Sequence, residues 1–133
     1  MDLFSLTRQL IDIESITDNE AAVGDFLHRH LTSLGYDSHK LPVEGERANV
    51  YAVPRGVSHP QLVLSTHMDV VPPWFGSSED EHNIYGRGAC DAKGIIAAQI
   101  AAAERLRKEG AAIGLFFLIG EEVFSPPNQI LYI

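Results

Sequence analysis

Two short apolar runs, separated by an alanine-rich segment, constrain the fold of this chain more than any other feature. The runs are residues 61–66 (QLVLST) and 113–119 (IGLFFLI), and the segment between them predicts a helix over residues 92–109 that Gly110 ends. Apolar runs of this length are typical of buried strands. Two strands connected by a helix lie parallel in a sheet, with a right-handed crossover. The pattern therefore predicts an α/β fold with two buried parallel strands.

The N-terminal part of the sequence predicts two helices followed by two strands. The first helix is expected over residues 3–15. The second is expected to begin at a T-x-x-E capping box formed by Thr17 and Glu20 and to end at Gly35. Residues 36–43 and 49–53 are expected to form strands, and the sequence contains no internal repeat.

Composition and charge exclude several classes of protein. The 133 residues are 45% hydrophobic and 21% charged, which is typical of a globular domain. Ten Lys and Arg against eighteen Asp and Glu give a net charge of −8 without any basic run, which argues against nucleic-acid and membrane partners. The single cysteine, Cys90, and an N-terminus without signal-peptide features predict a cytoplasmic protein.

Polar side chains follow both buried strands. His67 and Asp69 come directly after the first run, Glu121 and Glu122 follow the second, and Asp91 lies at the start of the connecting helix. Because the carboxyl ends of parallel strands meet at one edge of a sheet, we expect these five side chains to lie close together. One imidazole and four carboxylates would then share one crevice.

The chemistry of this group favours a metal ion. Four carboxylates in one crevice repel one another unless their pKa values rise or a cation is bound. Histidine with carboxylates is a ligand set suited to zinc, and a spare carboxylate beside the metal can take a proton from water. The sequence therefore predicts metal-assisted hydrolysis.

Each piece also has an ordinary alternative. A solvated strand end explains His67 and Asp69, surface charge explains the Glu pair, and Asp91 could be a helix N-cap. Cys90 could be the nucleophile of a cysteine hydrolase, although a lone cysteine in an Ala/Gly context is usually buried packing. Residues 86–91 begin like a nucleotide-binding G-x-G loop, but the carboxylate at the sixth position opposes a pyrophosphate.

Three segments resemble a known family. The segments STHMDVVPP, YGRGACDAKG and LIGEE, together with the S-x-T-x-x-E pattern of Ser15, Thr17 and Glu20, are similar to the co-catalytic zinc family of acetylornithine deacetylase, succinyl-diaminopimelate desuccinylase, aminoacylase and glutamate carboxypeptidase. The resemblance implies a three-layer α/β catalytic domain with a mixed, mostly parallel sheet and helices on both faces. It also implies hydrolysis of an amide bond in an N-acyl amino acid or peptide.

The resemblance assigns a role to each of the five polar residues. His67 would bind one zinc ion, Asp69 would orient the His67 ring, Asp91 would bridge two zinc ions, Glu121 would be the general base, and Glu122 would bind the second zinc ion. Cobalt is an alternative metal. The family also has a cis peptide bond after the bridging aspartate, here Asp91–Ala92.

Other features of the family are missing from these 133 residues. The family uses a further Asp or Glu and a late histidine as metal ligands, and a separate lid domain that forms the homodimer. We therefore expect residues 1–133 to be the truncated N-terminal portion of one catalytic domain, inactive and not dimeric alone, with an atypical tail at residues 123–133, in which Pro126 and Pro127 block a regular helix. The strand at residues 113–119 would then expose an apolar edge. The alternative to a truncated catalytic domain is a non-catalytic remnant that binds a partner or one metal ion weakly.

Overall fold

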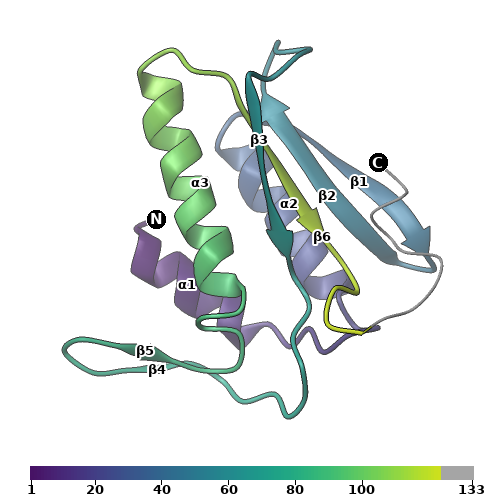
Figure 1. Ribbon diagram of the computed structural model, residues 1–133, viewed down its shortest axis with the longest axis vertical. Helices are drawn as coiled ribbons and strands as arrows, with labels where there is room; N and C mark the ends of the chain where they lie inside the picture. Colours follow the sequence, from purple (N-terminus) through teal and green to yellow (C-terminus); the bar gives the residue numbers. More distant parts are fainter. Residues whose placement is uncertain (124–133) are drawn as a thin grey trace.

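The computed structural model describes residues 1–123 of the chain. These residues form a four-stranded sheet with helices packed on it (Figure 1). The elements follow the order α1 (Leu3–Asp12), α2 (Ala21–Ser33), β1 (Tyr36–Glu44), β2 (Arg47–Pro54), β3 (Leu62–His67), β4 (Ser78–Glu79), β5 (Ile84–Tyr85), α3 (Lys93–Lys108) and β6 (Ile113–Leu118). The predicted order of helices and strands is confirmed.

The strand–helix–strand unit has the predicted geometry. β3 and β6 pair in parallel from Leu62 opposite Ile113 to His67 opposite Leu118, and α3 connects them and packs on both. Their carboxyl ends therefore lie side by side, which brings the segments after His67 and Leu118 to one edge of the sheet.

The rest of the sheet is antiparallel. The strand order is β1-β2-β6-β3; β1 and β2 form a hairpin, and β2 pairs antiparallel with β6. A tight hairpin turn requires antiparallel pairing, whereas a parallel pair needs a crossover. The α/β class and the mixed sheet are confirmed, but only one of the three strand pairs of this four-stranded sheet is parallel.

The strand order reverses two expectations about burial. β6 lies between β2 and β3, so the strand expected to expose its edge is central in the described part of the chain. β3 is the edge strand instead, and Leu62 and Val63 are 54% and 41% exposed rather than buried. Both strands are apolar runs, and hydrophobicity alone does not tell an edge strand from a central one.

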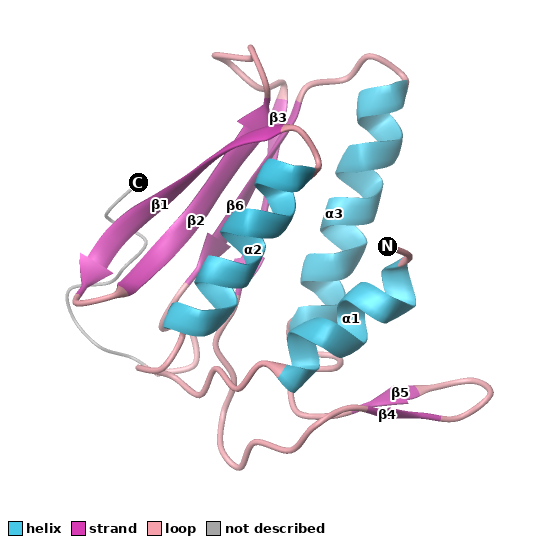
Figure 2. Cartoon of the chain, turned by 180° about the vertical axis from the view of Figure 1, so that it is seen from behind, coloured by secondary structure: helices cyan, strands magenta, loops and turns pink. Residues whose placement is uncertain are grey.

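The helices of residues 1–123 pack on one face of the sheet (Figures 1 and 2). α2 covers β1 and β2, α3 covers β3 and β6, and α1 packs against α3. Alternate strand residues face them, and the core contains Leu10, Leu27, Leu31, Val50, Ala52, Ile96, Ile100, Leu115 and Phe117. Residues 1–123 thus form two of the three expected layers, with helices on one face rather than both.

A short hairpin, β4–β5, interrupts the segment between β3 and α3 (Figure 2). Strands of two residues leave no alternation of apolar and polar positions, so the sequence alone does not indicate this hairpin. No helix within residues 1–123 has the length and apolar character needed to cross a bilayer. The expectation that Pro126 and Pro127 prevent a helix falls outside the described residues.

Candidate metal centre

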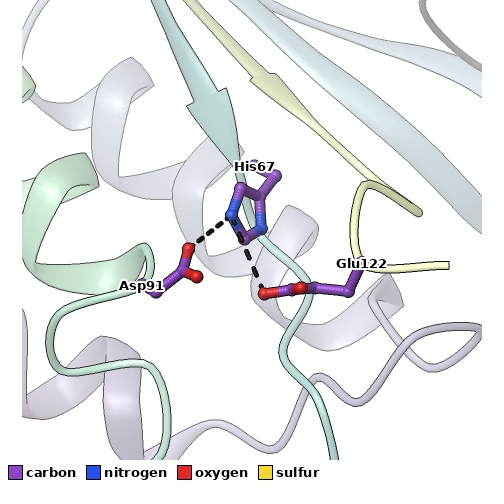
Figure 3. Close-up of side chains that lie close together, drawn as sticks. All are labelled: His67, Asp91 and Glu122. Atoms are coloured by element: carbon purple, nitrogen blue, oxygen red, sulfur yellow. Dashed lines mark hydrogen bonds and ion pairs between the residues drawn. The ribbon is translucent and has the colours of Figure 1, made fainter.

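His67 lies at the centre of a group of carboxylates at the carboxyl end of β3 (Figure 3). Its Nε2 atom is 2.8 Å from Oδ1 of Asp91, 3.7 Å from Oε2 of Glu121 and 4.0 Å from Oε1 of Glu122. These carboxylates come from two segments: the turn after β6 carries the two glutamates, and the residues just before α3 include Asp91. The predicted convergence at one edge of the sheet is confirmed.

Three of these residues have the spacing of a metal site. His67, Asp91 and Glu122 each offer one ligand atom, and the three atoms lie within 4.8 Å of one another. Ligand atoms around a tetrahedral zinc ion are about 3–3.5 Å apart, given bond lengths of about 2 Å. The distances of 2.8 and 4.0 Å from Nε2 lie on either side of that value, so small side-chain movements would fit an ion.

The second nitrogen of His67 faces Asp69. Nδ1 is 2.9 Å from the Asp69 backbone carbonyl and 3.3 Å from its Oδ1 atom. Burial disfavours the charged ring, but hydrogen bonds to Asp69 and Asp91 outweigh it and raise the pKa of His67 to about 9. Without a metal ion, a protonated imidazole therefore supplies the positive charge that the surrounding carboxylates require.

Asp69 is fully buried and connects several segments. Its carboxylate accepts hydrogen bonds from the Thr17 hydroxyl at 2.6 Å and from the backbone N–H groups of Glu121 and Glu122 at 3.0 Å each. Burial alone would raise the Asp69 pKa, but its contacts with His67, Thr17 and these two amides lower it. Asp69 is thus held as a carboxylate between His67 and the turn after β6.

The other carboxylates differ in exposure. The Asp91 and Glu121 side chains are 71% and 52% exposed, whereas Glu122 is mostly buried. Burial and the nearby charge of Asp91 raise the pKa of Glu122. Asp91 is not the N-cap of α3, since Ala92 occupies that position, and the Asp91–Ala92 peptide bond is cis, as the resemblance implies.

A cavity of about 380 Å³ opens beside the group. Asp91 and Glu122 line it on one side, and the exposed apolar side chains of Phe75 and Tyr85 line it on another. Cys90 also lines this cavity and is exposed, so the expectation of buried packing is wrong. A larger cavity of about 600 Å³ lies between α1 and the β4–β5 hairpin and contains none of the five predicted site residues.

Comparison with known proteins agrees with the geometry. Residues 63–128 match the profile of peptidase family M20/M25/M40. A probable carboxypeptidase from Talaromyces marneffei is 41% identical, in an alignment that covers 91% of this chain and 32% of that protein. Over residues 63–128 the chain is therefore similar to this peptidase family. The resemblance found in the sequence is confirmed, and the chain spans about a third of the length of the Talaromyces relative.

Solved structures of M20 proteins share the fold. An M20 metallo-carboxypeptidase from Sulfolobus solfataricus is 23% identical with a TM-score of 0.79, covering 92% of this chain and 32% of that one. A dinuclear metal-binding M20 peptidase from Bacillus subtilis is 15% identical with a TM-score of 0.63, covering 91% and 35%. At these identities the likeness supports the α/β fold alone.

The T-x-x-E pattern of Thr17 and Glu20 does not form a capping box. Glu20 is the N-cap residue of α2 but makes no side-chain cap hydrogen bond. Its carboxylate instead pairs with Arg47, at 2.8 Å, and the Thr17 hydroxyl donates to Asp69. The pattern does precede a helix, which begins at Ala21, but both side chains bind partners far away in the sequence.

Two further buried polar residues near the site were not identified from the sequence. Asn49 lies within the apolar strand β2, and its side-chain oxygen accepts the backbone N–H of Ile119 at 2.9 Å. Lys93 is two residues after Asp91 and donates to the Ile13 carbonyl, and burial lowers its pKa to about 8. A lone asparagine in an apolar strand was the available signal for Asn49, because buried polar groups normally have a bonding partner.

Proposed function

We propose that this chain carries part of the metal centre of a metal-dependent peptidase or amidohydrolase. Such an enzyme cleaves an amide bond in a peptide or N-acyl amino acid. The observation that carries this proposal is the approach of three carboxylates to Nε2 of His67. The match of residues 63–128 to peptidase family M20/M25/M40 supports peptide hydrolysis as the reaction class.

The ligand roles follow the family pattern. His67 would hold one ion, Glu122 a second, and Asp91 both, with zinc as the metal and cobalt as the alternative. The donor set fits, because imidazole and carboxylate are zinc ligands and the exposed Asp91 is free to turn toward two ions. The dinuclear metal binding of the Bacillus subtilis relative supports a site for two ions.

The metal ion and Glu121 would have different roles in the hydrolysis. A bound metal ion supplies a Lewis acid that polarises the scissile carbonyl and lowers the pKa of water. Glu121, half exposed and 3.7 Å from Nε2 of His67, would accept a proton from the attacking water at its carboxylate and deliver it to the leaving amine. Asp69 would keep the His67 ring oriented toward the site.

The cavity beside the ligands would receive the substrate. Its apolar side, which includes Phe75 and Tyr85, would contact side chains next to the scissile bond. Arg87 also lines the cavity and stacks over the Phe75 ring, which holds this wall in place. The substrate is a small peptide or N-acyl amino acid, and a cytoplasmic location without nucleic-acid or membrane partners remains the expectation from composition.

We propose that residues 1–133 are the N-terminal portion of one catalytic domain, and that this portion alone lacks turnover and is monomeric. His67, Asp91 and Glu122 nevertheless suffice to hold one ion, which favours a metal-binding module without catalysis as the second candidate function.

Metal-binding and activity assays test the proposed metal centre and the inactivity of this chain. The purified chain would be incubated with Zn²⁺ or Co²⁺ and with N-acetyl amino acids and dipeptides. The expected result is metal binding without turnover. Turnover that Glu121→Gln abolishes would refute the inactivity of this chain while supporting Glu121 as the base. Turnover that survives Glu121→Gln would refute the role of Glu121.

A further inference from the structure

Four consecutive backbone N–H groups in the turn after β6 each donate to a buried side-chain oxygen. Ile119 donates to Oδ1 of Asn49 at 2.9 Å, and Gly120 donates to Oε1 of Glu20 at 3.1 Å. The Glu121 and Glu122 amides donate to the two oxygens of Asp69, at 3.0 Å each. Side-chain acceptors therefore fix the backbone that carries both functional glutamates.

The acceptors are themselves held in place. Asn49, Glu20 and Asp69 are fully buried. Arg47 binds both oxygens of Glu20, at 2.8 and 3.1 Å, and the Thr17 hydroxyl binds the Asp69 oxygen that also accepts the Glu122 amide. Loss of one partner in such a buried network leaves a polar group without a hydrogen bond, which is unfavourable.

Residues 15–20 contact both the segment after β3 and the turn after β6. The Ser15 hydroxyl donates to the Met68 carbonyl at 2.8 Å, and the backbones of Ser15 and Thr17 pair with Val70. Glu20, at the end of the same segment, binds the Gly120 amide. One stretch of chain between α1 and α2 thus ties the segment after β3 to the turn after β6.

We propose that Thr17, Glu20 and Asn49 are positioning residues for the metal centre. They hold the turn of residues 119–122, directly or through Asp69, at a fixed place relative to His67. Glu121 and Glu122 carry the same charge as Asp91 and are repelled by it, and this scaffold keeps the backbone of the two glutamates in place before an ion binds. The inference rests on the metal centre proposed above and assigns the spacing of its ligands to residues that touch no ion.

Thr17 offers the cleanest test, because its hydroxyl can be removed at nearly constant volume. Thr17→Val should weaken Zn²⁺ binding about tenfold in calorimetric titration of the chain, the scale seen for partners of metal ligands. Thr17→Ser, which keeps the hydroxyl, should restore the affinity. Thr7→Val is the matched control, since it removes the buried Thr7 hydroxyl, which donates to the Leu3 carbonyl within α1.

A metal-free measurement accompanies the titration. In ¹H–¹⁵N spectra, Thr17→Val should shift the Glu121 and Glu122 amide resonances, and Thr7→Val should leave them in place. The inference is overturned if Thr17→Val binds Zn²⁺ like the unaltered chain, if Thr17→Ser fails to restore binding, or if Thr7→Val weakens binding equally. If the unaltered chain binds no Zn²⁺, the metal centre itself is refuted and the inference with it.

Discussion

The Asp69 carboxylate lies 3.3 Å from Nδ1 of His67, so the opposite nitrogen of the ring, Nε2, faces the remaining carboxylates. The same carboxylate holds the backbone of Glu121 and Glu122. One buried side chain therefore sets both the direction of the histidine and the position of the glutamates. Any change at Asp69 affects two sides of the site at once.

Asp69→Asn should weaken Zn²⁺ binding by about 10- to 100-fold. The amide keeps one acceptor oxygen, but its NH₂ group cannot accept the second backbone N–H, and the negative charge beside Nδ1 is lost. Calorimetric titration measures the affinity. Asp80→Asn is the control, because Asp80 is exposed and bonds only within the β4–β5 hairpin. Equal affinities for the two variants would contradict a role for Asp69.

Glu20→Ala should lower the free energy of unfolding by about 3 kcal/mol, because it leaves the mostly buried Arg47 without its buried partner. Urea denaturation measures this loss. The exposed pair of Asp25 and Lys40 provides the comparison, and Asp25→Ala should cost less than about 1 kcal/mol. Similar losses for both variants would show that the buried pair has no special weight.

Gly94→Ala should destabilise the chain by about 1–3 kcal/mol and weaken metal binding. A Cβ atom at Gly94 would overlap the Ala89 carbonyl oxygen, and relieving that overlap moves the start of α3 and Asp91. Gly24→Ala in α2 is the matched control, because its Cβ would lie 3.6 Å from the nearest atom. The free energy of unfolding of the Gly24→Ala variant should be unchanged or higher by up to about 1 kcal/mol. Thermal unfolding and zinc titration of both variants test the pair, and an unaffected Gly94→Ala chain would refute the close contact.

Zinc affinity should rise with pH up to about 9. The pKa of His67 is about 9 without metal, so below that pH an ion must displace the ring proton. Each pH unit from about 6 to about 8.5 should therefore strengthen binding up to tenfold. Calorimetry in buffers of different ionisation enthalpy should show release of about one proton per ion near pH 7. A flat pH profile without proton release would contradict the raised pKa.

The sequence predicted which residues form the site better than it predicted the contacts that hold those residues in place. His67, Asp91 and Glu122 could be placed together because parallel strands end at one edge, a rule that needs only the order of the elements. The contacts of Thr17 and Glu20 could not be predicted, since a T-x-x-E pattern describes local bonds and their partners lie 52 and 100 residues away.

The order of the strands in the sheet could not be predicted from the sequence either. Residues 61–66 and 113–119 have the same apolar character, yet β3 is at the edge of the described sheet and β6 is central. Which strand pairs with β2 depends on side-chain packing over the whole face, here on Val50 and Ala52 opposite Phe117 and Leu115. The exposure of Cys90 could not be predicted for a related reason, because the exposure of a side chain depends on neighbours distant in the chain.

Zinc titration of the chain and its His67→Ala variant tests the metal centre itself. Calorimetry should detect binding to the unaltered chain and to His82→Ala, whose histidine is exposed in the β4–β5 hairpin loop. Circular dichroism would confirm that each variant is folded. His67→Ala should bind at least about 100-fold more weakly, because it removes the only nitrogen ligand of the described cluster. Unchanged Zn²⁺ affinity in a folded His67→Ala chain would contradict a metal centre at His67, Asp91 and Glu122.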